Sequence, residues 1–140
     1  MKVTLERLGN ISFTAQTESG HRVIMDAAPA VGGENAGPRP MEMVLMGLGG
    51  CSGIDVISIL NKSRQQVSKC TIELSAERAD TIPRVFTHIH VHYVLSGNEL
   101  DSKKVERAIL LSMEKYCSVT RMLEKAASIS HDFEIQADPC

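Results

Sequence analysis

The chain has 140 residues, 43% of them hydrophobic, and a formal charge of −2 at pH 7. This length suits a single domain with one core, spanning residues 1–140. A small, scattered charge offers no basic surface to nucleic acid, so we expect no nucleic-acid partner. We see no signal-like segment and no apolar run of bilayer length, and therefore expect a cytoplasmic protein with no membrane partner.

The first forty residues predict short strands joined by turns. Apolar and polar residues alternate in short runs, and pairs containing glycine, Gly9-Asn10 and Ser19-Gly20, interrupt the runs. The expected strands lie at residues 3–5, 11–15 and 21–26. Residues 27–39 are rich in alanine, glycine and proline, and a loop of that length is often functional.

A long apolar helix is expected next. Pro38 or Pro40 can occupy its first turn, where a missing N–H costs nothing, and the helix should reach about Asn61. It is apolar on nearly every side, which is typical of a buried helix. Four glycines, at positions 47, 49, 50 and 53, are poor helix formers, but they allow a neighbouring backbone or a ligand to come close.

The remaining chain predicts strands, then two helices, then a strand. Strand patterns cover 68–78, 85–95 and 129–137, with helices expected at 103–115 and 118–127. Asp101 or Ser102 can cap the first of these helices, and Ser118 the second. The order of elements indicates an α+β fold rather than repeated βαβ units.

Four cysteines without a CxxC pair have to be interpreted singly. Cys51 lies among the helix glycines, which favours an approachable thiol over a packed one, although buried free cysteines are common. It sits too far into the helix for the helix N-terminus to lower its pKa, so a reactive Cys51 needs a nearby cation or hydrogen-bond donor. Asp55, one turn later, is either a surface acid or an anchor for an arginine; unpaired, it would raise the pKa of the thiol.

The other three thiols differ in their settings. Cys117 precedes Ser118 at a helix boundary, where a cysteine usually has a lowered pKa and is accessible, although simple packing explains it equally well. Cys70 shares an inward strand face with apolar residues and is expected to be packing. Cys140, at the end of the sequence, is expected to be a free thiol in a frayed segment.

Two segments carry a resemblance to a known family. The run from Pro40 to Cys51 resembles the Pro-Glu-x-Leu…Cys helix of the OsmC/Ohr family, and Tyr116-Cys117-Ser118-Val119 resembles its second cysteine motif. The order of elements is similar along essentially the whole chain, most closely to the branch whose helix reads Pro-Met-Glu-Leu and ends in Gly-Gly-Cys. The resemblance implies an OsmC-like α+β fold, with antiparallel sheets around a long buried helix, in an intertwined homodimer.

The resemblance also implies a redox function. Cys51 would reduce an organic hydroperoxide and become a sulfenic acid, Cys117 would condense with it to a disulfide, and an external dithiol would reduce that bond. No cofactor and no metal are implied. The family glutamate directly follows the proline, where this chain has Met41, so Glu42 is the nearest candidate. Arg39 is the nearer candidate for the family arginine and Arg22 is the other, on proximity alone.

Two other classes of function remain open. A binding protein could hold a small apolar molecule in a pocket at the dimer interface without enzymatic activity. A metal-binding module could use His88, His90 and His92, which lie on one face of a strand. The outer two are about 13 Å apart along a strand and cannot meet one ion, so a solvated strand face is the expectation.

Overall fold

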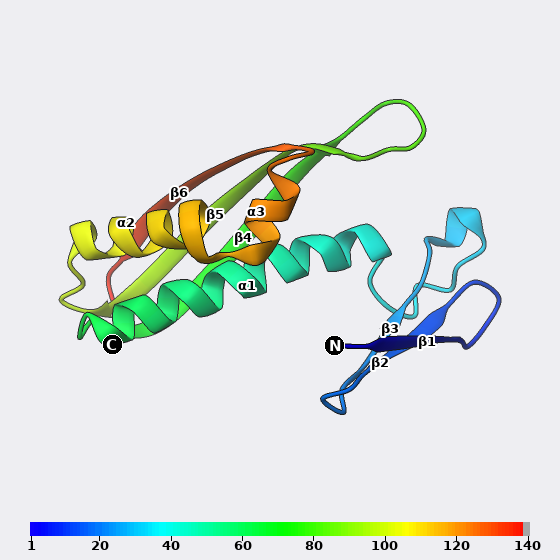
Figure 1. Ribbon diagram of the computed structural model, residues 1–140, viewed down its shortest axis with the longest axis horizontal. Helices are drawn as coiled ribbons and strands as arrows, with labels where there is room; N and C mark the ends of the chain where they lie inside the picture. Colours follow the sequence, from blue (N-terminus) through cyan, green and yellow to red (C-terminus); the bar gives the residue numbers. More distant parts are fainter. Residues whose placement is uncertain (139–140) are drawn as a thin grey trace. The chain divides into compact units, whose positions relative to one another are not determined.

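The computed structural model describes residues 1–138, and its fold is α+β, as the sequence predicts. The chain divides into two compact units, Met1–Met46 and Gly47–Cys140. The first unit holds an antiparallel sheet in the order β1-β2-β3 (Figure 1). Its strands are β1 (Val3–Arg7), β2 (Phe13–Thr17) and β3 (Arg22–Met25), which confirms the three expected strands.

One carboxylate orders the loop after β3. Asp26 is buried, and it accepts backbone N–H bonds from Ala27 at 2.7 Å, Glu34 at 2.8 Å and Ala36 at 3.1 Å. The bonds from Glu34 and Ala36 lower the pKa of Asp26 most. The loop contains a single 3-10 turn, η1 (Pro29–Val31).

The long helix, α1 (Pro40–Lys62), begins as expected at a proline. The carboxylate of Glu42 accepts the backbone N–H of Arg39 at 2.8 Å, which is one half of a capping box. By length and composition alone, α1 is apolar enough to cross a membrane. The core helix of a globular domain meets the same criterion, and Leu48, Val56 and Leu60 of α1 are fully buried.

The second unit holds a three-stranded sheet in the order β4-β5-β6. The strands are β4 (Gln66–Arg78), β5 (Phe86–Asn98) and β6 (Ser128–Gln136). β4 is antiparallel to β5, but β6 runs parallel to β5, unlike the antiparallel pairing that the resemblance implies. A parallel pair needs a long crossover, and the helices between β5 and β6 supply it.

The crossover contains three helical segments: α2 (Ser102–Leu111), the π-helical turn η2 (Ser112–Tyr116) and α3 (Ser118–Leu123). Asp101 caps α2 through its side chain, which accepts the N–H of Lys103 at 2.9 Å. The sequence predicts one helix over 103–115, whereas the α-helix ends at Leu111 and a π turn follows. That turn sets the position of the residue after it, Cys117.

Figure 1 shows α1, α2 and α3 on the same side of this sheet. The covered face of β5 presents Ile89, Val91 and Tyr93, each fully buried, and the histidines alternate with them on the other face. Glycines let α1 lie close to β4: a Cβ on Gly49 or Gly53 would come within 2.7 Å of a side-chain methyl carbon of β4. The sequence predicts that a backbone or a ligand comes close, whereas the close neighbours of these two glycines are side chains, and a Cβ on Gly47 or Gly50 would have none within 4 Å.

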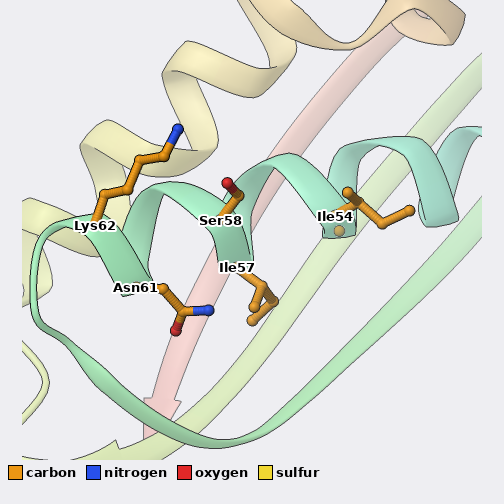
Figure 2. Close-up of a pocket in the computed structure, with 6 residues that line it drawn as sticks. Ile54, Ile57, Ser58, Asn61 and Lys62 are labelled. Atoms are coloured by element: carbon orange, nitrogen blue, oxygen red, sulfur yellow. The ribbon is translucent and has the colours of Figure 1, made fainter.

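Within residues 47–138, the opposite face of α1 is exposed. Ile54 is 73% exposed, although the apolar pattern predicts a helix buried on all sides. A shallow hollow of about 580 Å³ runs along this face (Figure 2). Its lining residues are Gly53, Ile54, Ile57, Ser58, Asn61 and Lys62.

Candidate functional site

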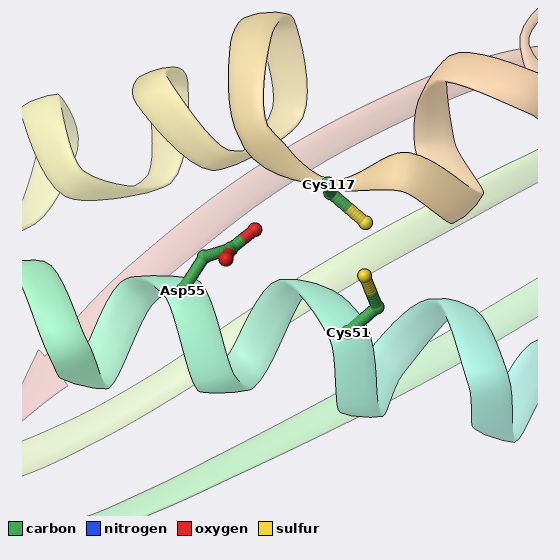
Figure 3. Close-up of side chains that lie close together, drawn as sticks. All are labelled: Cys51, Asp55 and Cys117. Carbon is green, nitrogen blue, oxygen red and sulfur yellow. The ribbon is translucent and has the colours of Figure 1, made fainter.

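Two thiols face each other between α1 and the crossover helices. Figure 3 shows the side chains of Cys51 and Cys117 pointing toward one another, with Asp55 beside them. The two sulfur atoms and a carboxylate oxygen of Asp55 all lie within 4.8 Å of one another. Cys51 is half-buried and Cys117 is fully buried, and neither forms a disulfide. The structure therefore brings together the two cysteines that the sequence singles out.

Cys117 is itself the cap of α3. Its sulfur accepts the backbone N–H of Thr120 at 3.4 Å, and its own N–H donates to the carbonyl of Ser112 at 2.8 Å. The prediction that Ser118 caps this helix is therefore wrong by one residue. The prediction of an accessible thiol with a lowered pKa is also wrong, because burial raises the pKa of Cys117 and outweighs the opposing bonds from Thr120.

A buried polar network links Asp55 to the sheet. The hydroxyl of Ser112 donates to Asp55 at 3.1 Å and lies 2.9 Å from the hydroxyl of Ser52. Ser52 in turn contacts the phenol oxygen of Tyr93, and Tyr93 also donates to the sulfur of Met113 at 3.4 Å. Burial raises the pKa of Tyr93 to about 12.

Sequence reasoning missed this network. Its one signal was a serine at position 52, a hydroxyl in an otherwise apolar stretch of helix next to Cys51. For Asp55 the sequence left open an arginine partner. Within residues 47–138, the partner of its carboxylate is the hydroxyl of Ser112, and the ion pairs of this part of the chain do not include Asp55.

The other two candidates lie in the first unit. Glu42 bonds to the backbone of Arg39, as described, and the guanidinium of Arg39 donates to the side chain of Asn35 at 2.8 Å and to the carbonyl of Gly37 at 3.2 Å. These contacts show how the start of α1 is held. The catalytic roles of Arg39 and Glu42 stay predictions.

The remaining cysteines have separate settings. Cys70 is a free, half-buried thiol on β4, and burial raises its pKa, in keeping with the expected packing role. Cys140 lies outside the described residues.

The fold and the facing thiols define a small α+β protein with a paired-cysteine site. The chain matches the family model described as OsmC-like protein over residues 32–132, and so it belongs to the OsmC-like family. It is 47% identical to protein YhfA of Escherichia coli (strain K12) over 137 residues, which cover 98% of this chain and 99% of that relative.

Solved structures agree with this assignment. A hypothetical protein from Aquifex aeolicus VF5 is 33% identical with a TM-score of 0.86, over 99% of this chain and 97% of that one. The organic hydroperoxide resistance protein OhrB of Bacillus subtilis has a TM-score of 0.63 at 17% identity, over 95% of this chain and 96% of that one. At that identity the likeness to OhrB is one of fold. The resemblance seen in the two cysteine motifs is confirmed.

Proposed function

We propose that this protein is a thiol-dependent peroxidase that reduces organic hydroperoxides with Cys51 and Cys117. The observation that carries the proposal is the pair of facing sulfur atoms, within 4.8 Å, in a chain of the OsmC-like family. The names of related structures support the substrate class, since OhrB of Bacillus subtilis is an organic hydroperoxide resistance protein.

The proposed reaction has three steps. The Cys51 thiolate attacks the terminal oxygen of the hydroperoxide and the O–O bond breaks, so that Cys51 becomes a sulfenic acid. The alkoxide that leaves takes up a proton and becomes the alcohol. The Cys117 thiol then displaces water from that sulfenic acid and forms the Cys51–Cys117 disulfide. An external dithiol reduces the disulfide by exchange and is itself oxidised.

Burial supports this order of reaction. Cys51 is half-buried and can meet a peroxide, whereas Cys117 is fully buried and its pKa is raised, which suits a thiol that waits for an adjacent sulfenic acid. Arg39 and Glu42 complete the proposed catalytic set, and Arg39→Ala and Glu42→Gln should each slow the first step.

The proposal includes a cytoplasmic homodimer. The open apolar face of α1 around Ile54 supports it, because a second copy would cover a surface that this chain leaves exposed. Light scattering at micromolar concentration tests this point, and a monomer would refute it.

A stoichiometric experiment tests the chemistry. Reduced protein receives a small excess of tert-butyl hydroperoxide, and the remaining thiols are counted and any disulfide mapped. We expect one Cys51–Cys117 disulfide in the natural sequence and in Cys70→Ser, the matched control for a half-buried thiol outside the pair. Cys51→Ser should lose thiol oxidation at low peroxide, while Cys117→Ser should react once, accumulate sulfenic acid and over-oxidise.

A binding protein for small apolar molecules is the alternative, and the hollow beside Ile54 and Ile57 is the observation in its favour (Figure 2). If Cys117→Ser is oxidised no faster than Cys51→Ser, the peroxidase proposal fails. Saturable binding of an apolar fluorescent probe by the same reduced protein would then favour the alternative.

A further inference from the structure

A second cluster of ligating side chains lies on the sheet face opposite the helices. His90 and His92 on β5 and Asp132 on β6 each offer one donor atom, and the three atoms lie within 4.8 Å of one another. We propose that His90, His92 and Asp132 bind one divalent transition-metal ion, with Zn²⁺ and Ni²⁺ as the best-suited ions. This site is independent of the thiol pair and of the proposed peroxidase activity.

The strand register explains how the site forms. His90 and His92 are two residues apart and therefore share a face of β5, and the parallel pairing places Asp132 directly beside His92. Sequence spacing rules out one ion shared by all three histidines, and that argument stands. The third ligand instead comes from the neighbouring strand, whose register cannot be read from the sequence.

The distances suit a metal ion after small side-chain adjustments. One oxygen of Asp132 lies 2.9 Å from Nε2 of His90 and 2.6 Å from Nδ1 of His92. Ligands about 2.0–2.1 Å from a tetrahedral ion are about 3.3–3.4 Å from one another. The two ring nitrogens lie within 4.8 Å of each other. All three side chains are partly exposed, so each can adjust its position and an ion can reach them from solvent.

Further groups on the same face hold the rings and favour a cation. The second ring nitrogen of His90, Nδ1, lies 2.7 Å from the hydroxyl of Ser130, which orients the ring with Nε2 toward Asp132. Besides Asp132, the carboxylates of Glu73 on β4 and Glu134 on β6 act on His92 electrostatically. Two imidazoles and a carboxylate suit zinc and nickel, and leave room for water to complete the coordination.

His88 offers a matched control within the same row. Its ring nitrogens lie 2.7 Å from the hydroxyl of Ser128 and 3.1 Å from that of Ser130, and it is not part of the cluster. A variant at His88 removes one histidine from the strand face without removing a proposed ligand.

Zinc titration against a chromogenic chelator tests the site. Cys51, Asp55 and Cys117 form the other group of potential metal ligands among the described residues, so the titration uses the full chain carrying Cys51→Ser and Cys117→Ser. We expect one equivalent of Zn²⁺ to bind, with affinity at least about tenfold weaker after His92→Gln, His90→Gln or Asp132→Asn. Affinity should be unchanged after His88→Gln. Circular dichroism checks that each variant is folded, and three separate ligand variants keep the result interpretable if one is not.

Three outcomes would overturn the proposal. The first is the absence of zinc binding once Cys51 and Cys117 are replaced, which would assign any binding in the natural sequence to the thiols. The second is a loss of zinc affinity in His88→Gln as large as in the ligand variants, which would indicate loose binding by all three histidines of the strand. The third is an unchanged zinc affinity in Asp132→Asn. This would show that Asp132 is not a ligand, although the proposed geometry depends on it.

Discussion

The hydroxyl of Ser112 lies 3.1 Å from a carboxylate oxygen of Asp55, and this bond joins the π turn η2 to α1 beside the two thiols. Because the hydroxyl is neutral, the carboxylate keeps its negative charge, which a cationic partner would offset. A negative charge near a sulfur disfavours the thiolate form. The pair therefore ties the crossover to the helix and places a carboxylate beside the two thiols.

Replacing Asp55 by Asn should make Cys51 react faster with iodoacetamide at neutral pH, because it removes a carboxylate that lies within 4.8 Å of the Cys51 sulfur. Mass spectrometry of the alkylated peptide measures the rate. Ser112→Ala is the control: it removes the hydrogen bond but keeps the charge, so it should bring no such acceleration. An unchanged rate in Asp55→Asn would show that the carboxylate does not influence Cys51.

The cap formed by Cys117 gives a second prediction. Serine can accept the N–H of Thr120 as the cysteine sulfur does, but alanine cannot. In reduced protein, Cys117→Ala should therefore have a free energy of unfolding about 1 kcal/mol lower than Cys117→Ser. Urea unfolding of the two variants measures the difference. Equal stability would mean that the sulfur contributes packing but no useful cap.

Local patterns predicted most of the elements of the fold. The alternation of apolar residues predicted the strands, and Pro40 with the apolar run after it predicted α1. Both patterns involve residues that are close in the sequence, so they can be recognised without the structure. The end of α2 at Leu111 was missed, since α-helical and π-helical turns share the same residue types. The parallel pairing of β6 was missed as well, because strand order is fixed by contacts between distant segments.

The candidate site, like the fold, was predicted from the sequence only in part. Motif spacing identified Cys51 and Cys117, but not the environment of Cys117. Its position before a helix predicts a lowered pKa, and only the packed structure shows that burial reverses the direction. Ser52 and Tyr93 were invisible as a pair because 41 positions separate them along the chain.

Tyr93 should control part of the stability at high pH. Burial raises its pKa to about 12, while a tyrosine in the unfolded chain ionises near pH 10. The unfolded state therefore loses this proton first, so the contribution of the neutral phenol is complete below about pH 10 and is lost as the pH rises toward 12. Tyr93→Phe should flatten the fall in stability over this range.

Two measurements check this prediction. Unfolding at several pH values, from neutral to strongly alkaline, gives the stability curves of the natural sequence and of Tyr93→Phe. Absorbance at 295 nm follows phenol ionisation, and subtracting the Tyr93→Phe curve isolates Tyr93, because the chain has only two tyrosines. Ionisation of Tyr93 near pH 10 in folded protein would contradict the expected burial effect.

Ile54 should decide whether α1 pairs with a second copy. It is 73% exposed on the open apolar face, and a helix that is apolar on nearly every side is expected to be covered. If a second copy covers this face, Ile54→Glu places an unpaired charge in the interface and should produce a monomer at micromolar concentration. Multi-angle light scattering measures the mass.

Ile82→Glu is the matched control. Ile82 is 92% exposed and lies outside the helices and strands, so this variant should leave the dimer intact. A dimer in both variants would show that the interface lies elsewhere, and dissociation of both would show that added charge acts without regard to position.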